Sequence, residues 1–100
     1  MLESTFQRKT RKEIEDVIFP DCIVKRNEPW DHQGFPDLTI FKGCKYAHLE
    51  FKRSADAVHQ PNQDYYIDLF NKMGAYAAFI YPENKDEIVE ELKDYFNQSD

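Results

Sequence analysis

The stretch GFPDLTIFKGCKYAHLEFK, residues 34–52, decides which fold this sequence favours. Its pattern is typical of two short strands joined by a tight turn. Residues 42–45 suit a two-residue turn of type II′, in which Gly43 comes first. With the tip of the hairpin fixed in this way, Lys42 pairs with Lys45, and the two residue numbers of every cross-strand pair add up to 87. Asp37 therefore faces Glu50.

The alternation of side chains along this hairpin places the two carboxylates on one face. Successive strand residues point to opposite sides of a sheet, so His48, Glu50 and Lys52 share the side opposite Leu49. Asp37 points to the same side, with its Cβ atom roughly 4.5–5.5 Å from that of Glu50. Like charges at this separation destabilise a sheet unless a positive charge lies between them. A divalent cation would provide that charge.

Length and composition predict a single domain over residues 1–100 and no membrane partner. The chain has 100 residues, 41% of them apolar, which is enough to bury a core. No apolar run approaches the ~20 residues that span a bilayer. The first ten residues are too polar for a signal peptide. Cys22 and Cys44 lack metal-ligand spacing and are too few for a disulfide framework, so a reduced, cytoplasmic setting is expected.

The net charge of −6 argues only superficially against a nucleic-acid partner. Residues 1–53 carry 10 basic and 9 acidic side chains, whereas residues 54–100 carry 3 and 10. The basic residues gather around the first predicted helix and the hairpin, where they could contact backbone phosphates. The candidates for these contacts are Arg8, Lys9, Arg11, Lys12, Lys42, Lys45 and Arg53. The run in the first helix is also typical of a solvated helix face.

Periodicity and turn residues predict the order helix, three strands, helix, strand, helix. The elements are a helix over about 3–18, a strand over 22–26, the hairpin, a helix with Pro61 in its first turn, a strand over 75–81 and a last helix to Phe96. The strand over 75–81 is apolar throughout, as expected of a strand covered on both faces. The order indicates an α/β fold with a mixed sheet flanked by helices.

Apolar side chains predict which helix faces pack against the sheet. In the first helix they are Phe6, Ile14, Val17 and Ile18. In the second helix they are Tyr66, Leu69, Phe70 and Met73. Asn84 and Glu87 fit a capping box at the start of the last helix.

The grouping of Asp37, Glu50 and Lys52 suits phosphodiester hydrolysis. Two carboxylates can bind Mg²⁺ and leave coordination positions for water and phosphate oxygens. A lysine on the same face can orient the attacking water or stabilise developing negative charge. The alternative is a charged strand face in solvent. Joint occurrence on facing strands, with the correct alternation and a short turn, favours the metal site.

Other polar residues fall near this group. At ~100° per residue, Glu3 and Gln7 lie within the apolar arc of the first helix. Glu3 then points toward the carboxylate pair, unless it lies in water at a frayed helix end. Gln63 opens the second helix, whose N-terminus favours phosphate, and Gln60 is an alternative. His48 supports the site, binds a softer metal or fills space.

These residues resemble the PD-(D/E)xK nuclease superfamily through Pro36-Asp37 and the triplet at 50–52. More narrowly, the sequence resembles the virus-type replication-repair nuclease domain, VRR-NUC, of the stand-alone phage or bacterial type. That family has an early helical glutamate, a Gly-x-Pro-Asp motif, a Glu-x-Lys motif and a helix with a glutamine. The matching residues here are Glu3, residues 34–37, residues 50–52 and Gln63. The resemblance covers essentially the whole chain.

The resemblance implies a Mg²⁺- or Mn²⁺-dependent endodeoxyribonuclease with a restriction-endonuclease-like core of order α-β-β-β-α-β-α. The implied metal ligands are Asp37, Glu50, the backbone carbonyl of Phe51 and Glu3, the last directly or through water. The implied catalytic residues are Asp37, Glu50, Lys52, Glu3 and Gln63. Gln7, His48 and Gln60 are expected to support them.

The resemblance also implies a substrate and an assembly. The expected substrate is branched DNA, such as a four-way (Holliday) junction, in DNA repair within a bacterial or phage-infected cell. One chain offers few basic residues, so a homodimer is expected because it doubles that set. A catalytically idle DNA-binding or structural subunit is one alternative, and a metal hydrolase that uses His48 with Glu50 is another. The presence of Lys52 favours the nuclease.

Overall fold

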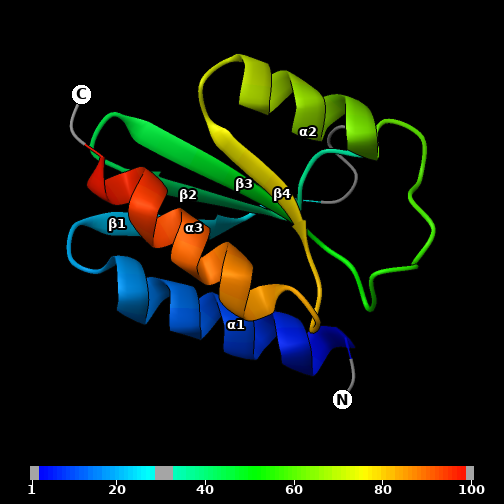
Figure 1. The fold of residues 1–100 in the computed structure, drawn as a ribbon, viewed down its shortest axis with the longest axis horizontal. Coiled ribbons are helices and arrows are strands. Elements are labelled where there is room, and N and C mark those ends of the chain that lie inside the picture. Colours follow the sequence, from blue (N-terminus) through cyan, green and yellow to red (C-terminus); the bar gives the residue numbers. More distant parts are fainter. Residues whose placement is uncertain (1–2, 29–32, 99–100) are drawn as a thin grey trace.

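A computed structural model describes residues 3–28 and 33–98, with the backbone alone at residues 3 and 4. The described chain has the predicted order α-β-β-β-α-β-α (Figure 1). The elements are α1 (Glu3–Ile18), β1 (Cys22–Arg26), β2 (Leu38–Lys42), β3 (Lys45–Phe51), α2 (Gln63–Lys72), β4 (Tyr76–Ile80) and α3 (Lys85–Asn97). The expected α/β fold is therefore confirmed. None of the described helices is long and apolar enough to cross a membrane.

The four strands form one mixed sheet in the order β1-β2-β3-β4. β1, β2 and β3 are antiparallel neighbours, and β4 lies parallel to β3. Leu38 pairs with Leu49 and Lys42 with Lys45, which confirms the predicted hairpin register. Gly43 has a φ of 62°, whereas Cys44 is not among the residues with positive φ. This combination fits the expected II′ turn, because the positive φ falls at its first central position.

Helices cover both faces of the sheet (Figure 1). α1 and α3 lie side by side over one face, and α2 packs on the other against β3 and β4. The main hydrophobic core fills the space under α1 and α3, with Ile14, Leu49 and Leu92 fully enclosed. The central strand β3 is buried on both faces from Ala47 to Phe51. The polar side chains of His48 and Glu50 on β3 therefore lie in a protein interior instead of in water.

The packing face of α1 differs from the predicted arc at two residues. Phe6, Ile14 and Ile18 are buried as expected, but Val17 is 36% exposed and Thr10 is 2% exposed. The buried side chains follow the i, i+4 row from Phe6 through Thr10 to Ile18. Residues in an i, i+4 row lie on one ridge of a helix that drifts slowly around its axis, so an arc averaged over the whole helix misplaces its last turn.

The boundary and packing of α2 also differ from the predicted ones. The helix begins at Gln63, because Asn62 has a left-handed φ of 71° and Pro61 lies in the preceding turn. Ile67 is its buried residue, whereas Met73 is 58% exposed. Met73 lies beyond the last helical residue, where α2 leads into Gly74 (φ 93°) and then β4. The predicted apolar stripe therefore extended one turn too far.

The predicted capping box at α3 is wrong in its hydrogen bonds. Asn84 occupies the cap position, but its side chain makes no bond to the helix. Its Oδ1 accepts a bond from the Tyr81 amide at 2.8 Å, and its Nδ2 donates to the Phe79 carbonyl at 3.1 Å. Asn84 thus closes the turn between β4 and α3 instead of capping the helix, because the exposed amides after β4 compete for the same side chain.

Candidate active site

Asp37 and Glu50 meet at the end of the β2–β3 hairpin that lies opposite its turn. Asp37 directly precedes β2, whose first residue Leu38 pairs with Leu49, so the next pair along the ladder is Asp37 and Glu50. The backbone amide of Phe51 donates a hydrogen bond of 2.9 Å to Oδ2 of Asp37. The structure therefore brings the two carboxylates together as the hairpin register requires.

Glu50 lies in an interior that does not favour its charge. Its side chain is 6% exposed, and Oε2 accepts a hydrogen bond of 3.0 Å from Nε2 of Gln63. Oε1 is also buried and has no hydrogen-bond partner among the described residues. Burial, together with the neighbouring Asp37, raises the pKa of Glu50 to about 8. The site thus contains a carboxylate oxygen for which the described part of the chain supplies no positive or donating partner.

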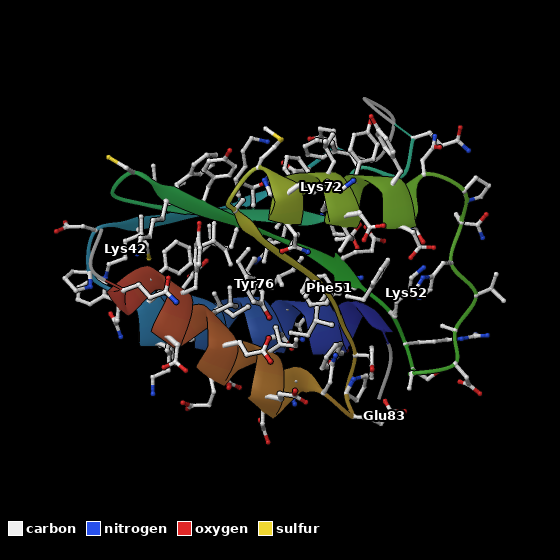
Figure 2. All side chains as sticks on the ribbon, turned by 45° about the horizontal axis from the view of Figure 1, so that its top comes forward. Lys42, Phe51, Lys52, Lys72, Tyr76 and Glu83 are labelled. Atoms are coloured by element: carbon white, nitrogen blue, oxygen red, sulfur yellow. The ribbon has the colours of Figure 1, made fainter. Side chains whose placement is uncertain are left out.

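Lys52 completes the group one residue beyond the end of β3. Its side chain is 8% exposed, and Nζ donates to Oε1 of Gln63 at 2.6 Å and to the Val58 carbonyl at 3.1 Å. Nζ also lies 5.9 Å from the ring centre of Phe79 on β4. Figure 2 shows Lys52 beside Phe51 at one end of the molecule. An ammonium group that is buried and bonded in this way is held in place near the two carboxylates.

Gln63 links the lysine to the glutamate. Its amide nitrogen donates to Glu50, and its amide oxygen accepts from Lys52 and from the backbone amide of Gln60 at 2.8 Å. Gln60 contributes that amide and lines the adjoining cavity, and no hydrogen bond of its side chain is found within the described part of the chain. Of the two candidate glutamines, Gln63 is the one whose side chain contacts both residues of the site.

The loop before Asp37 packs tightly against the start of α2. Gly34 has a φ of 84°, and a Cβ atom at that position would lie 2.6 Å from Cβ of Asn62 and 3.0 Å from the amide of Gln63. Only glycine fits so close an approach in this conformation. The loop glycine therefore sets the distance between the segment that carries Asp37 and the helix that carries Gln63.

These residues surround an open cavity of about 440 Å³. Asp37, Glu50 and Lys52 line it, and its other walls come from residues 57–63 and α1. Gln7, half-buried on α1, reaches it as the predicted arc requires. The backbone of Glu3 begins α1, but its side chain lies outside the described residues.

The donor set fits a hard divalent cation. Carboxylate and carbonyl oxygens are the ligands that Mg²⁺ and Mn²⁺ prefer. Asp37 and Glu50 supply such oxygens, and the unpartnered Oε1 of Glu50 is what a cation would satisfy. Over the described ranges, no group of three or more His, Cys, Asp and Glu side chains gathers to hold a metal. Further ligands would therefore be the backbone carbonyl of Phe51, water, substrate and Glu3.

His48 lies deeper on the same strand face, under α2. Its Nδ1 bonds to Oγ1 of Thr39 at 3.0 Å, and its ring stacks on Phe70 at 3.7 Å between centres. Burial lowers the pKa of His48 to about 4, so the ring is neutral at physiological pH. Its Nε2 lacks a partner among the described atoms. These contacts make His48 part of the packing between β3 and α2.

Asn27, after β1, is a site-positioning residue that sequence reasoning missed. Its backbone amide donates to the Asp37 carbonyl at 2.8 Å. Its Nδ2 donates to the Pro36 carbonyl at 2.9 Å and to Oγ1 of Thr39 at 2.8 Å. Asn27 thereby fixes the backbone on both sides of Asp37. A single asparagine in a polar loop carries no sequence signal for this role.

The candidate DNA-contacting residues divide into two groups. Arg8, Arg11 and Arg53 line cavities at the candidate site, and Lys9 and Lys12 lie on the exposed side of α1. Lys42 and Lys45 flank the hairpin turn, at the far end of the sheet, and Figure 2 shows Lys42 distant from Lys52.

The two lysines at the turn bind helix ends. Lys42 Nζ donates to the Ile18 carbonyl at 2.6 Å. Lys45 Nζ donates to the carbonyls of Tyr95 and Gln98 at 3.0 and 2.6 Å. These contacts satisfy carbonyl groups at the C-terminal ends of α1 and α3, where a positive charge is favourable.

The order of the elements and the mixed four-stranded sheet flanked by helices place this chain in the α/β class. No protein-family model and no curated protein matches this sequence. Among solved structures, a protein described as "VRR_NUC domain protein" matches with a TM-score of 0.71 and 17% sequence identity. The match covers 100% of this chain and 92% of that chain. At this identity it shows the fold, and it confirms the predicted resemblance to a VRR-NUC domain at the level of structure.

Proposed function

We propose that this protein is a metal-dependent nuclease that hydrolyses phosphodiester bonds of DNA. The observation that carries this proposal is the buried Oε1 of Glu50, which has no hydrogen-bond partner among the described residues and lies beside Asp37, with Lys52 held on the same side of the sheet. An idle subunit would gain nothing from this arrangement, because an unpaired buried carboxylate destabilises the fold. The VRR-NUC fold supports the same reaction class.

Mg²⁺ or Mn²⁺ would be held by Asp37, Glu50 and the backbone carbonyl of Phe51, with Glu3 as a further ligand directly or through water. When bound, such an ion supplies charge that stabilises the phosphate and lowers the pKa of a water molecule. Asp37 is pre-positioned for this role by the Phe51 amide, which leaves its second oxygen available. Gln63 leaves one oxygen of Glu50 available in the same way.

Lys52 is the group that orients the attacking water or stabilises the charge developing on the phosphate. Its ammonium donates to Gln63 and to the Val58 carbonyl, so its position does not depend on the carboxylates alone. Gln63 in turn holds Glu50, and thus sets the separation between the ammonium and the carboxylate. Gln63 is therefore a positioning residue for Lys52, and Gln60 supports it through its backbone amide.

The proposed substrate is branched DNA, cut by a homodimer. The basic residues near the site in one chain, Arg8, Arg11 and Arg53, can neutralise only a few phosphates. Each neutralised phosphate contributes a slope of roughly −0.9 to the salt dependence of binding to duplex DNA. A two-fold dimer doubles the contacts and presents two sites to two strands, which suits a four-way junction.

A cleavage panel tests the reaction. The substrates are linear duplex, single strand, flap and four-way junction, each with Mg²⁺, Mn²⁺ or EDTA. We expect paired nicks in the junction with either metal and none in EDTA; Glu50→Ala serves as an inactive control and Lys52→Ala as a slow one. No cleavage of any substrate by wild-type protein with either metal would reject the nuclease function.

Assembly and substrate choice are tested separately. Light scattering at micromolar concentration should give the mass of a dimer. A monomer that cuts linear and four-way DNA equally would contradict both the dimer and the substrate. A dimer that cuts only single strands would retain the assembly and reject the substrate.

A further inference from the structure

A second hollow adjoins the candidate active site on the side of α1. It encloses about 350 Å³ between the first half of α1, the end of β1 and the start of β2. Its lining residues are Gln7, Arg8, Arg11, Arg26, Asn27, Asp37, Leu38 and Phe51. Three of these, Gln7, Asp37 and Phe51, also line the cavity that contains Glu50 and Lys52. The two hollows therefore share a wall at the proposed metal site.

Three guanidinium groups line this hollow, and none of them has an acidic partner among the residues that the structure describes. Within the described ranges, no ion pair involves Arg8, Arg11 or Arg26, and none of their guanidinium groups makes a hydrogen bond; Lys25 Nζ donates to the backbone carbonyl of Arg26 at 3.3 Å. Some other cations of the protein lie beside carboxylates: Lys12 lies 3.8 Å from Asp16, and Lys85 lies 2.8 Å from Glu13. Three positive charges around a hollow with one carboxylate attract an anion.

Backbone hydrogen bonds hold Arg26 next to Asp37. Arg26 is the last residue of β1 and pairs with Leu38, the first residue of β2. The following residue, Asn27, donates its backbone amide to the Asp37 carbonyl at 2.8 Å. Arg8 and Arg11 approach from α1, where residues three apart lie on the same side of the helix. The three arginines thus come from two elements that the fold fixes beside the site.

We propose that Arg8, Arg11 and Arg26 bind a phosphate group of the substrate strand other than the one that is cleaved. This inference rests on the proposed nuclease function and adds the path of the strand. One phosphate lies at Asp37 and Glu50, and another lies in the arginine hollow. The paired N–H groups of a guanidinium match two phosphate oxygens in geometry and charge, whereas carboxylates repel a phosphate. The bound group is either an internal phosphodiester or a terminal phosphate.

Single neutral linkages in the DNA test this assignment. Oligonucleotides that each carry one methylphosphonate are titrated by fluorescence anisotropy, in EDTA and in Ca²⁺. At one linkage we expect the wild-type protein to lose roughly 3- to 10-fold in affinity, because a charged contact is removed. In Arg26→Ala the same linkage should lower the affinity less than about 2-fold. The contact is already lost in this variant, so neutralising the phosphate removes little more. Strands with a 5′- or 3′-terminal phosphate or hydroxyl distinguish a terminal from an internal group.

Lys72→Ala is the matched control. Lys72 is exposed at the end of α2 away from Gln63 and has no ion pair within the described residues. Like Arg26→Ala, Lys72→Ala therefore removes one positive charge. That variant should retain the full effect of the neutral linkage, and Arg26→Lys should give an intermediate one. Equal effects in wild type, Arg26→Ala, Arg8→Ala and Arg11→Ala would overturn the proposal, as would absence of DNA binding in both buffers. If the arginine variants abolish the effect of the neutral linkage but the wild type cuts no DNA in Mg²⁺, the nuclease function is rejected and the phosphate site retained. If the wild type cuts DNA but the arginine variants leave the effect of the linkage unchanged, the nuclease function is retained and the phosphate site rejected.

Discussion

The backbone amide of Phe51 donates a hydrogen bond of 2.9 Å to the carboxylate of Asp37. Asp37 lies just before β2, so this bond extends the β2–β3 pairing by one residue through a side chain. A charged acceptor makes such a bond stronger than a neutral one. The same residue, Phe51, therefore fixes one carboxylate by its amide and offers its carbonyl to the proposed metal. Four predictions follow from the arrangement around this pair.

Removal of either carboxylate should abolish metal binding. Asp37→Ala and Glu50→Ala each lose half of the side-chain ligands of the described site, so Mn²⁺ titrated by calorimetry should give no measurable heat of binding. Lys52→Ala should bind Mn²⁺ like the wild type, because it keeps both carboxylates. Its turnover should be at least roughly 10²-fold slower, because it loses the charge-stabilising group. Undiminished binding by Glu50→Ala would reject the ligand assignment. Equal loss of binding in Lys52→Ala would mean that Lys52 has a structural role.

The metal-free protein should lose stability as the pH rises, and Glu50 should cause much of this loss. The pKa of Glu50 in the folded state is about 8, above its ordinary value of 4.5, because the residue is buried and lies beside Asp37. The folded state therefore binds more protons than the unfolded state between these values. The stabilisation is complete below about pH 4.5 and disappears as the pH rises through 8.

Glu50→Gln tests this pH dependence because glutamine stays neutral at every pH. In EDTA at pH 9 the variant should unfold at a higher temperature than the wild type. Its free energy of unfolding should be higher by on the order of 2–4 kcal/mol. At pH 4.5 the two should be nearly equal. Glu15→Gln, at an exposed position on α1, should show no such crossover. A constant difference between Glu50→Gln and the wild type from pH 4.5 to 9 would contradict the raised pKa.

Gln63 should matter for turnover, and Gln60 should not. Gln63→Ala removes both the acceptor of Lys52 and the donor to Glu50, so Lys52 loses its fixed position. We expect kcat to fall roughly 10-fold or more while KM changes little, because the loss lies in the positioning of a catalytic group. Gln60→Ala keeps the backbone amide that bonds to Gln63 and should resemble the wild type. A larger loss in Gln60→Ala than in Gln63→Ala would reverse the assignment.

Gly34→Ala should lower the free energy of unfolding more than the same change at the other glycines with positive φ. An added Cβ would lie 2.6 Å from Cβ of Asn62, whereas at Gly43 and Gly74 it would meet nothing within 4 Å. Gly43→Ala should therefore cost about 1–2 kcal/mol in unfolding free energy from backbone strain alone. Gly34→Ala should cost about 1–3 kcal/mol more from overpacking, and should lower activity by displacing the start of α2. Denaturant unfolding measures both values, and equal costs would show that the close approach relaxes freely.

Local rules were enough for the hairpin and its carboxylate pair. The turn at Gly43 fixed the register, and the register with strand alternation placed Asp37 opposite Glu50 before any tertiary contact was known. The order of elements followed from periodicity in the same way. Gln63 and Lys52 were both identified as candidates, but their 2.6 Å contact depends on how α2 docks on β3, which no local pattern specifies.

The features that sequence reasoning missed all depend on contacts between distant segments. Thr10 is buried and Val17 exposed because the packed face of α1 follows the row of residues 6, 10, 14 and 18. Asn84 bonds to the turn after β4, which offers it alternative partners. Arg26 appeared to be only the end of a short strand, and its place beside Asp37 follows from the pairing of β1 with β2. Docking angles and cross-strand neighbours decide these positions, and neither is encoded in a short window of sequence.

The hairpin turn, where Lys42 and Lys45 bind the ends of α1 and α3, gives the experimentalist an attachment point. Cys44 is exposed at its tip, whereas Cys22 is only half-buried on β1, so Cys22→Ser leaves one readily accessible thiol. A dye on Cys44 would sit on a part of the molecule anchored to both helices and separated from Glu50 by most of the length of β3. Energy transfer from that dye to a labelled DNA arm would then report the direction in which the strand lies across the protein.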